Sequence, residues 1–399
     1  MSLPWRYKAR EEMVKVYFDN SATTKVDPRV LEAMMPFFTE EYGNPSSLHH
    51  FGRVANDALA TARNQVAKAM GSSREDIIFT SGGTESDNIA IQGFAFANKD
   101  KGDHIITSSI EHHAVLHTCR FLESQGFKVT YVPVNEEGFV PIEDLKSAIN
   151  PRTILISVMA ANNEIGVIQP VRDIGEICHD QGVAFHTDAV QAFTKMPLDI
   201  ERDNIDMLSI SGHKFHGPKG VGALYVRRGL NIRPTMYGGG HEKGLRSSTE
   251  NVSGIVGIGK AVEIAMTSMD SDIERMTFLR DRIIDGVLSQ IQNSHFNGSR
   301  AKRLCNNAHF RFDFIDGESL VLELDEMGIA TSTGSACSTR SRDPSHVLTA
   351  IGLKPELARG SLRVSISRMS TSEEVDYFLE ALPRAVVKLR TISPLSSWE

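Results

Sequence analysis

Cysteine is scarce in this sequence of 399 residues, which contains four: Cys119, Cys178, Cys305 and Cys337. No two of them are close enough in sequence to indicate a zinc site or a redox couple, which argues against a disulfide scaffold. Aromatic residues make up 7% of the chain, and no run approaches the roughly 20 apolar residues of a spanning helix. We therefore expect neither a metal site nor a transmembrane segment.

An excess of positive charge is also missing. Lys and Arg number 43 against 50 Asp and Glu, for a net charge of −7, so nothing attracts the chain to nucleic acid or anionic lipid in general. The first residues mix both charge signs and lack the apolar stretch of a secretory signal, which favours a cytoplasmic location. The remaining composition, 41% hydrophobic and 23% charged, is that of an ordinary globular protein.

Short β-rich runs alternate with segments of helical apolar spacing over the first two thirds of the chain. This alternation is typical of a mostly parallel sheet covered by helices, which is the α/β fold class. Helical spacing is expected at 114–124, 141–149 and 170–180. Seven runs are expected as strands: 77–80, 104–107, 128–132, 153–159, 183–187, 207–210 and 222–226.

The last third of the chain has a different pattern. A long helical pattern leads from Asn251 to about Asn293, and a second group of elements follows it. Its expected strands lie at 308–313 and 362–367, and its expected helices at 318–326 and 372–390. A length of 399 residues also suits two domains. We predict a large α/β domain, residues 25–268, and a smaller α+β domain formed by residues 1–24 and 269–399.

A glycine turn follows the first predicted strand, in the run Ser81–Ser86. A strand, a glycine turn and the start of a helix together form a cradle for a phosphate group. A plain tight turn with Thr84 as helix N-cap explains this run equally well. The run Gly254–Lys260 resembles a nucleotide-binding loop, but Ala261 stands where the hydroxyl residue belongs and no strand precedes it. We interpret that second run as a helix packed through small residues.

Two further predicted strands end in ionisable groups. Asp188 follows one apolar strand, where an acid is costly unless paired, and Lys214 follows the next in the run Ser211–Gly220. A lone lysine in such a turn is usually a solvated cation. Buried near an acid and a phosphate cradle, it becomes a nucleophilic amine with a lowered pKa. Cradle, acid and lysine together are the parts that a pyridoxal phosphate site requires.

The sequence resembles the cysteine desulfurases of the class V aminotransferase family, which have the fold type I architecture, from about Val16 to about Pro394. No single motif is decisive, but their joint occurrence in this order is highly specific. The matching segments are Tyr17–Thr24, Gly43–Ser47, Thr80–Ser86, Glu111–His112, Asn162–Gly166, Ser211–Gly222, Gly238–Gly240, Ser332–Cys337 and Arg363.

The resemblance implies a role for each cofactor-binding residue. Lys214 would bind pyridoxal 5'-phosphate covalently and carry the substrate's α-proton, and Asp188 would pair with the ring nitrogen. His112 would stack on the ring and pass protons. The other residues expected to hold the cofactor are Gly83, Thr84, Asn163, Gln191, Ser211 and His213, with Gln191 facing the phenolic oxygen and Thr84, Ser211 and His213 at the phosphate.

The substrate residues are also implied by the resemblance. Asn163 and Arg363 would hold the carboxylate of L-cysteine, since arginine offers paired donors to a carboxylate. Without the resemblance, Arg363 would be taken as an outward-facing strand residue. Cys337 lies in a small, polar and cationic segment, which we expect to be a mobile loop that keeps a thiolate available. In the resembling family this cysteine takes the substrate sulfur as a persulfide, and a loop of this length is similar to that of the housekeeping enzymes, which serve an iron-sulfur cluster scaffold protein.

The glycine-rich segment 238–249 bears on whether the protein forms a dimer. It is too polar for a core element and is expected as a flexible exposed loop. The resemblance implies a homodimer in which Thr249 caps the cofactor phosphate of the neighbouring subunit. Three alternatives to a cysteine desulfurase stay open: a selenocysteine lyase, a true aminotransferase, which would not need Cys337, and a non-catalytic binding protein, against which the presence of Lys214 argues.

Overall fold

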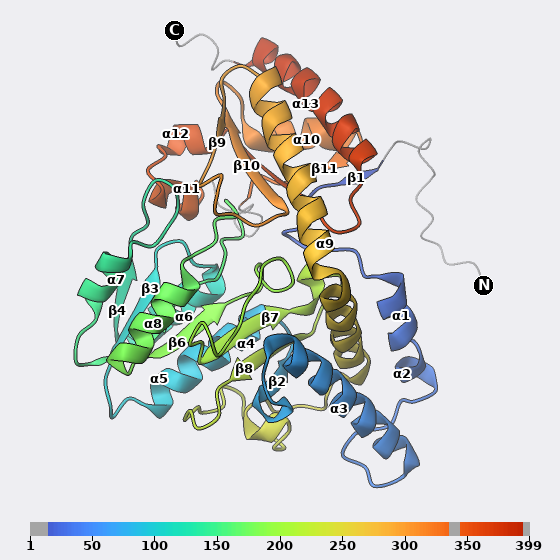
Figure 1. Cartoon of the computed structure of the whole chain (residues 1–399), viewed down its shortest axis with the longest axis vertical. Coiled ribbons are helices and arrows are strands. Elements are labelled where there is room, and N and C mark those ends of the chain that lie inside the picture. Colours follow the sequence, from blue (N-terminus) through green and yellow to red (C-terminus); the bar gives the residue numbers. More distant parts are fainter. Residues whose placement is uncertain (1–14, 335–343, 394–399) are drawn as a thin grey trace.

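A seven-stranded sheet forms the centre of the protein (Figure 1), whose computed structural model describes residues 15–334 and 344–393. The strand order is β2-β8-β7-β6-β5-β3-β4. Strand β8 runs antiparallel to both of its neighbours, and the other pairings are parallel. In sequence order the strands are β2 (Ile77–Thr80), β3 (His104–Ser108), β4 (Lys128–Val132), β5 (Thr153–Ser157), β6 (Ala184–Asp188), β7 (Met207–Ser211) and β8 (Gly222–Val226).

Helices cover both faces of this sheet because alternate residues of its strands point in opposite directions. Ile77 and Phe79 pack in the core under α1 (Pro28–Met34), α3 (His50–Met70), α8 (Val171–Gln181) and the first half of α9. Ile78, between them, packs in the core under α5 (Phe94–Ala97) and α6 (His113–Ser124). The predicted mostly parallel α/β fold is therefore confirmed.

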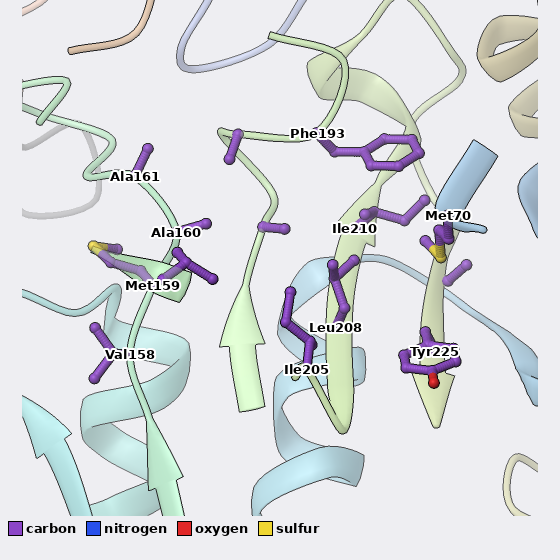
Figure 2. Close-up of a cluster of buried hydrophobic side chains, with 14 of the residues drawn as sticks. Met70, Val158, Met159, Ala160, Ala161, Phe193, Ile205, Leu208, Ile210 and Tyr225 are labelled. Atoms are coloured by element: carbon purple, nitrogen blue, oxygen red, sulfur yellow. The ribbon is translucent and has the colours of Figure 1, made fainter. Parts of the chain in front are cut away.

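Figure 2 shows part of the first of these cores. Leu208 and Ile210 project from β7 toward the same side of the sheet, and Tyr225 projects from the neighbouring β8. Phe193 lies above them on the chain that follows β6, and Met159 lies on the chain that follows β5. The segments after β5 and β6 are therefore packed by apolar side chains, which holds the polar residues beside them in place.

Helix α9 (Val252–Gln290) contains the glycine-rich run Gly254–Lys260, so the interpretation of that run as a helix is confirmed. A Cβ atom on Gly257 would lie 2.7 Å from the sulfur of Met34, and one on Gly259 would lie 2.8 Å from Cα of Ala62. These glycines let α9 approach α1 and α3 closely. By length and composition α9 could also cross a membrane, but one such helix is weak evidence, and half of its most apolar window is buried inside the protein.

A second, smaller core lies beyond the middle of α9. It packs a three-stranded antiparallel sheet of order β12-β10-β9 against α9, α10 and α13, which appear together at the top of Figure 1. Val16 of the short strand β1 (Val16–Tyr17) joins this core and pairs with β11 (Ile329–Ala330). The other elements are β9 (Ser294–Phe296), β10 (Asn307–Phe312), α10 (Gly317–Glu326), β12 (Ser361–Ser365) and α13 (Ser372–Ile392).

The remaining short helices complete the described chain. Helix α11 contributes Val347 and Leu348 to the core of the large sheet, although it follows the small core's β11 in sequence. The division of the chain at residues 24 and 268 remains a prediction. The helices not yet given are α2 (Pro36–Thr39), α4 (Gly83–Asn88), α7 (Ile142–Ala148), α11 (His346–Ala350) and α12 (Pro355–Ala358).

Candidate active site

A cavity of about 560 Å³ opens at the carboxyl ends of β6 and β7, between the large sheet and the small core. Ligands of parallel sheets bind at this edge. Ten of the predicted site residues line it, although they come from positions spread over 280 residues of sequence. They are Gly83, Thr84, His112, Asn163, Asp188, Gln191, Ser211, His213, Lys214 and Arg363.

One end of the cavity is formed by the start of α4. The helix begins at Gly83 with Gly82 as its N-cap, so Thr84 is not the capping residue and the tight-turn alternative for its hydroxyl is wrong. The first backbone N–H groups of a helix have no partner within it and favour an anion. A Cβ atom on Gly83 would lie 2.6 Å from Cγ2 of Val190, so only glycine fits there. Ser211 and His213 line the same cavity, and His213 Nδ1 lies 3.1 Å from Oγ1 of Thr23.

The buried carboxyl groups that line the same cavity include those of Asp188 and Asp87. Asp188 is the last residue of β6, and its Oδ1 accepts a hydrogen bond from the backbone N–H of Val190 at 2.9 Å. Asp87, from α4, is buried as well. Burial raises the pKa of Asp188, while the Val190 N–H and the nearby Lys214 act to lower it. Burial, followed by the charge of Asp188, raises the pKa of Asp87 well above its usual value.

Lys214 ends a short 3-10 turn, Gly212–Lys214, that follows β7. Its Nζ donates hydrogen bonds to the carbonyl oxygens of Ser21 at 2.6 Å and Ala22 at 2.8 Å. Burial, followed by the charges of Arg363 and Lys195, lowers the pKa of Lys214 to about 7. A substantial share of this amine is therefore neutral near neutral pH, as a nucleophilic lysine requires.

His112 precedes α6 as its N-cap. Its Nδ1 accepts a hydrogen bond from the backbone N–H of Ala114 at 3.1 Å. Burial, with Lys214 as the next cause, lowers the pKa of His112 to about 4. The imidazole is thus neutral at working pH, and because Nδ1 accepts, the ring proton resides on Nε2. His112 can donate a hydrogen bond from Nε2 but is not a cation.

Arg363, on β12, forms the opposite wall, which supports its predicted position in a site rather than on an outer face. Its Nη1 donates to the carbonyl oxygens of Asn163 at 3.0 Å and Gly334 at 3.1 Å. Its Nη2 donates to Oδ1 of Asp19 at 2.8 Å. Its Nε is buried and has no hydrogen-bond partner among the described residues, and the same holds for Oε1 of Gln191. Such unpaired buried groups are costly unless a ligand satisfies them.

Two predicted residues are not in the cavity as described. Thr249 is exposed and does not line the cavity of its own chain. Cys337 lies outside the described residues. The described chain stops at Gly334 and resumes at Pro344, and both of these residues line the cavity. The other three cysteines are buried, and burial raises the pKa of each thiol, which makes them unreactive.

The sequence interpretation missed several groups in or beside the cavity. Asp19 lies in the recognised segment Tyr17–Thr24 without a predicted role, and it is an ion-pair partner of Arg363. Asp87 and Glu164 line the cavity itself, and Oε2 of Glu164 accepts from the hydroxyl of Ser345 at 2.5 Å. The spacing in the sequence could have indicated Asp87, because an acid four positions after Gly83 lies on the face of α4 that meets the sheet.

The segment 238–249 is also better anchored than its glycine content predicts. Glu242 is buried, and its two oxygens accept hydrogen bonds from both terminal nitrogens of Arg63 on α3 at 2.6 and 2.8 Å. It also accepts from the backbone N–H of Phe79 at 2.9 Å. The expectation of a wholly flexible exposed loop is therefore wrong, because its one buried acid is paired. Among residues 15–334 and 344–393, no group of three or more metal-ligating side chains is arranged to hold a metal ion.

Comparison with known proteins gives the family. Residues 16–378 match the family described as aminotransferase class-V, and the chain belongs to this family. A relative from Clostridium botulinum, named "Cysteine desulfurase IscS", is 54% identical over 387 residues, which cover 96% of this chain and 97% of the relative. A solved structure named "NifS-like protein" superposes with a TM-score of 0.89 at 42% identity, covering 94% of this chain and 100% of that one. Another, titled "SspA in complex with cysteine", has a TM-score of 0.79 at 38% identity, with 90% and 100% covered.

The cavity fits pyridoxal phosphate, on which this family depends. It offers an anion-binding helix start at Gly83 with no room for a side chain, a neutral lysine amine and a buried acid. Oε1 of Gln191 is a further polar group, for which the described part of the chain offers no hydrogen-bond partner. One cavity therefore offers the helix start for the phosphate of the cofactor, the lysine amine for its carbonyl carbon and the buried acid for its ring nitrogen.

Proposed function

We propose that this protein is a pyridoxal phosphate-dependent cysteine desulfurase that converts L-cysteine to L-alanine and keeps the sulfur as a persulfide on Cys337. The observation that carries this proposal is the cavity in which Lys214 and Arg363 line facing walls. The balance is simple: L-cysteine and the thiol of Cys337 give L-alanine and a persulfide, so no external oxidant or reductant is needed. The high identity to enzymes named cysteine desulfurase supports the same reaction.

The lining of the cavity supports a set of residues that would hold the cofactor. Gly83, Thr84, Ser211 and His213 would bind its phosphate, and Asp188 would pair with its ring nitrogen. Gln191, Asn163 and His112 would contact its ring. When bound, the cofactor supplies a carbonyl carbon for the lysine amine and a ring that stabilises negative charge at the substrate's α-carbon.

Proton movement falls to Lys214 and His112. The amine of Lys214, with its pKa near 7, takes the α-proton of the substrate and can return it to a neighbouring atom. His112 is neutral and carries its proton on Nε2, so it donates to a group over the ring without adding positive charge. The buried surroundings of both residues exclude water, which protects the reacting carbon from stray protons.

Substrate binding falls to the opposite wall. The carboxylate of L-cysteine accepts a hydrogen bond from the unpaired Nε of Arg363, whose Nη1 is already used by two backbone carbonyls. Asn163 lies beside it in the same wall. A cysteine bound in the relative titled "SspA in complex with cysteine" supports an amino acid of this size.

Sulfur transfer is assigned to Cys337. Supporting this choice, the chain that carries it leaves and re-enters the described part of the protein at Gly334 and Pro344, both of which line the cavity. Cys119, Cys178 and Cys305 are buried with raised thiol pKa values, so none of them is a competing nucleophile. We further propose an iron-sulfur cluster scaffold protein as the sulfur acceptor, and a cytoplasmic location.

A homodimer is part of the proposal. Large apolar side chains are exposed on the surface that carries α1 to α3 and on the segment before Gly238, with Leu48 at 92%, Tyr42 at 67% and Tyr237 at 80% exposed. A second copy of the chain would cover such side chains. Thr249 is exposed as well, and in the proposed dimer its hydroxyl would reach the phosphate site of the partner subunit.

The direct test is to mix the purified yellow protein with L-cysteine and to measure sulfide and alanine together. Equal amounts of both products, formed repeatedly in the presence of a thiol, are expected. Turnover of selenocysteine without turnover of cysteine would favour a selenocysteine lyase. Conversion of the cofactor to its amine form in exchange with a keto acid would favour an aminotransferase, and no chemistry with either substrate would favour a binding protein.

A further inference from the structure

Asp87 is a buried carboxyl group at the cavity to which the proposed function gives no role. It lies on α4, is 1% exposed, and its Oδ1 accepts no hydrogen bond from the described residues. Nε2 of His186 lies 3.6 Å from this oxygen. His186 is neutral, because burial lowers its pKa to about 3. An ionised Asp87 would therefore be a buried charge without a counter-ion, which proteins avoid by keeping such a group protonated.

Among the neighbouring acids, Asp188 has the largest effect on the pKa of Asp87. It lies two residues beyond His186 on β6, so both side chains point to the same face of the strand. The charge of Asp188 acts to raise the pKa of Asp87, and that of the buried Glu111 acts in the same direction. Both carboxyl groups are buried and line the same cavity, and two such groups are not both ionised near neutral pH, so they share a proton.

The surroundings decide which of the two holds the proton. Asp188 accepts a backbone hydrogen bond from Val190 at 2.9 Å and feels the positive charge of Lys214. For Asp87, the hydroxyl of Ser209 stabilises the charged form, and that hydroxyl also lies 3.0 Å from Nε2 of His186. The charged form is thus better stabilised at Asp188 than at Asp87.

We propose that Asp87 and Asp188 hold one proton between them and that it resides on Asp87, which leaves Asp188 as the charged member that faces the cofactor ring. Asp87 is then a positioning residue. Its neutral carboxyl group adds no second charge to the cavity. The negative charge therefore stays on Asp188. This inference rests on the proposed pairing of Asp188 with the ring nitrogen.

The first test titrates the cofactor-free protein. With aspartate labelled by carbon-13 at the carboxyl carbon, NMR signals of Asp87 and Asp188 are assigned by their loss in Asp87→Asn and Asp188→Asn. Asp87 is expected to titrate at higher pH than Asp188 and to be protonated at pH 7. An Asp87 signal that titrates before Asp188 would overturn the proposal. If Asp87→Asn does not fold, Asp87→Ser, which also lacks the carboxyl group, provides the assignment of the Asp87 signal.

The second test measures the dissociation constant of the cofactor for the same variants. An asparagine mimics a protonated aspartic acid in shape and charge, so Asp87→Asn should change this constant by no more than about threefold, while Asp188→Asn should raise it more than about tenfold. Equal losses in the two variants would mean that Asp87 carries a needed charge. A protein that desulfurates L-cysteine but titrates in the wrong order refutes only this inference, whereas a correct titration order without desulfuration refutes only the proposed function.

Discussion

The two walls of the cavity are built in different ways. One wall consists of residues at the ends of neighbouring strands: Asp188 is the last residue of β6, and Lys214 lies in the turn that follows β7. The other wall depends on Arg363, which is held in place by Asp19 and by backbone carbonyls from distant parts of the chain. The first wall carries the groups for cofactor chemistry and the second those for substrate binding. Changes in the two walls should therefore have separable effects.

The largest effect is expected for Lys214→Ala in the cofactor wall. Without the amine, desulfuration should fall by about 10⁴-fold or more, since both covalent binding and proton transfer are lost. The fold should persist, because Lys214 is not one of the residues that form the hydrophobic cores. The yellow absorbance and alanine formation measure this loss. Lys219→Ala, an exposed lysine five residues away, is the matched control and should retain turnover within about twofold; a Lys214→Ala protein with wild-type turnover would refute the assignment.

Cys337→Ser tests the segment that begins and ends at the cavity. Serine is a much weaker nucleophile toward sulfur than a thiolate, so turnover should fall more than about 100-fold while the cofactor stays bound. Mass spectrometry after treatment with L-cysteine should find the added sulfur atom in the wild-type protein and not in the variant. Cys305→Ala is the control and should still carry the added sulfur. Sulfur found on Cys119, Cys178 or Cys305 instead would contradict the assignment.

Arg363→Lys probes the substrate wall. Lysine cannot reproduce the several fixed donors of the guanidinium, so KM for L-cysteine should rise about 10- to 100-fold. The dissociation constant of the cofactor should stay close to that of the wild type. Arg311→Lys on the neighbouring strand β10, where Arg311 pairs with Asp313 at 3.3 Å, serves as the control. Weakened cofactor binding without a change in KM would show that cofactor binding and substrate binding are not assigned to separate walls.

The pH dependence of cofactor attachment separates Lys214 from an ordinary lysine. Only the neutral amine reacts with a carbonyl, and the pKa of Lys214 is lowered to about 7. The rate of attachment to the cofactor-free protein should therefore rise about tenfold per pH unit below pH 7 and level off above it. Stopped-flow absorbance at saturating cofactor measures this rate. A rate that still rises steeply at pH 9 would mean that the amine has its usual pKa.

The smallest effect is expected for Thr249→Ala. One hydroxyl lost from the phosphate site should speed loss of the cofactor on dialysis by about threefold, without unfolding. In mixed dimers the effect should appear at the site of the partner subunit. Thr267→Ala, an exposed threonine on α9, is the control. Sedimentation of an active monomer with fully bound cofactor would contradict the shared site.

Much of the cofactor wall could be predicted from sequence because it depends on local signals. The seven strands were predicted within two residues at each end, since apolar runs bounded by turns mark them, and Asp188 and Lys214 follow from their places after strands. The ion pair of Arg363 with Asp19 could not be predicted, because 344 residues separate the two. The pairing of Glu242 with Arg63 on α3 was missed for the same reason. The two- and three-residue strands β1, β9 and β11 have too few residues for any periodicity to show.

Helix α9 has a consequence for how the protein unfolds. Its 39 residues span about 58 Å, and its first half contributes Ile258 and Val262 to the large core while its second half contributes Ile283 and Val287 to the small core. Loss of either core would expose half of this helix to water and remove the support of the other half. We therefore expect both cores to melt together in one calorimetric transition, so that the two walls of the cavity are either both assembled or both lost.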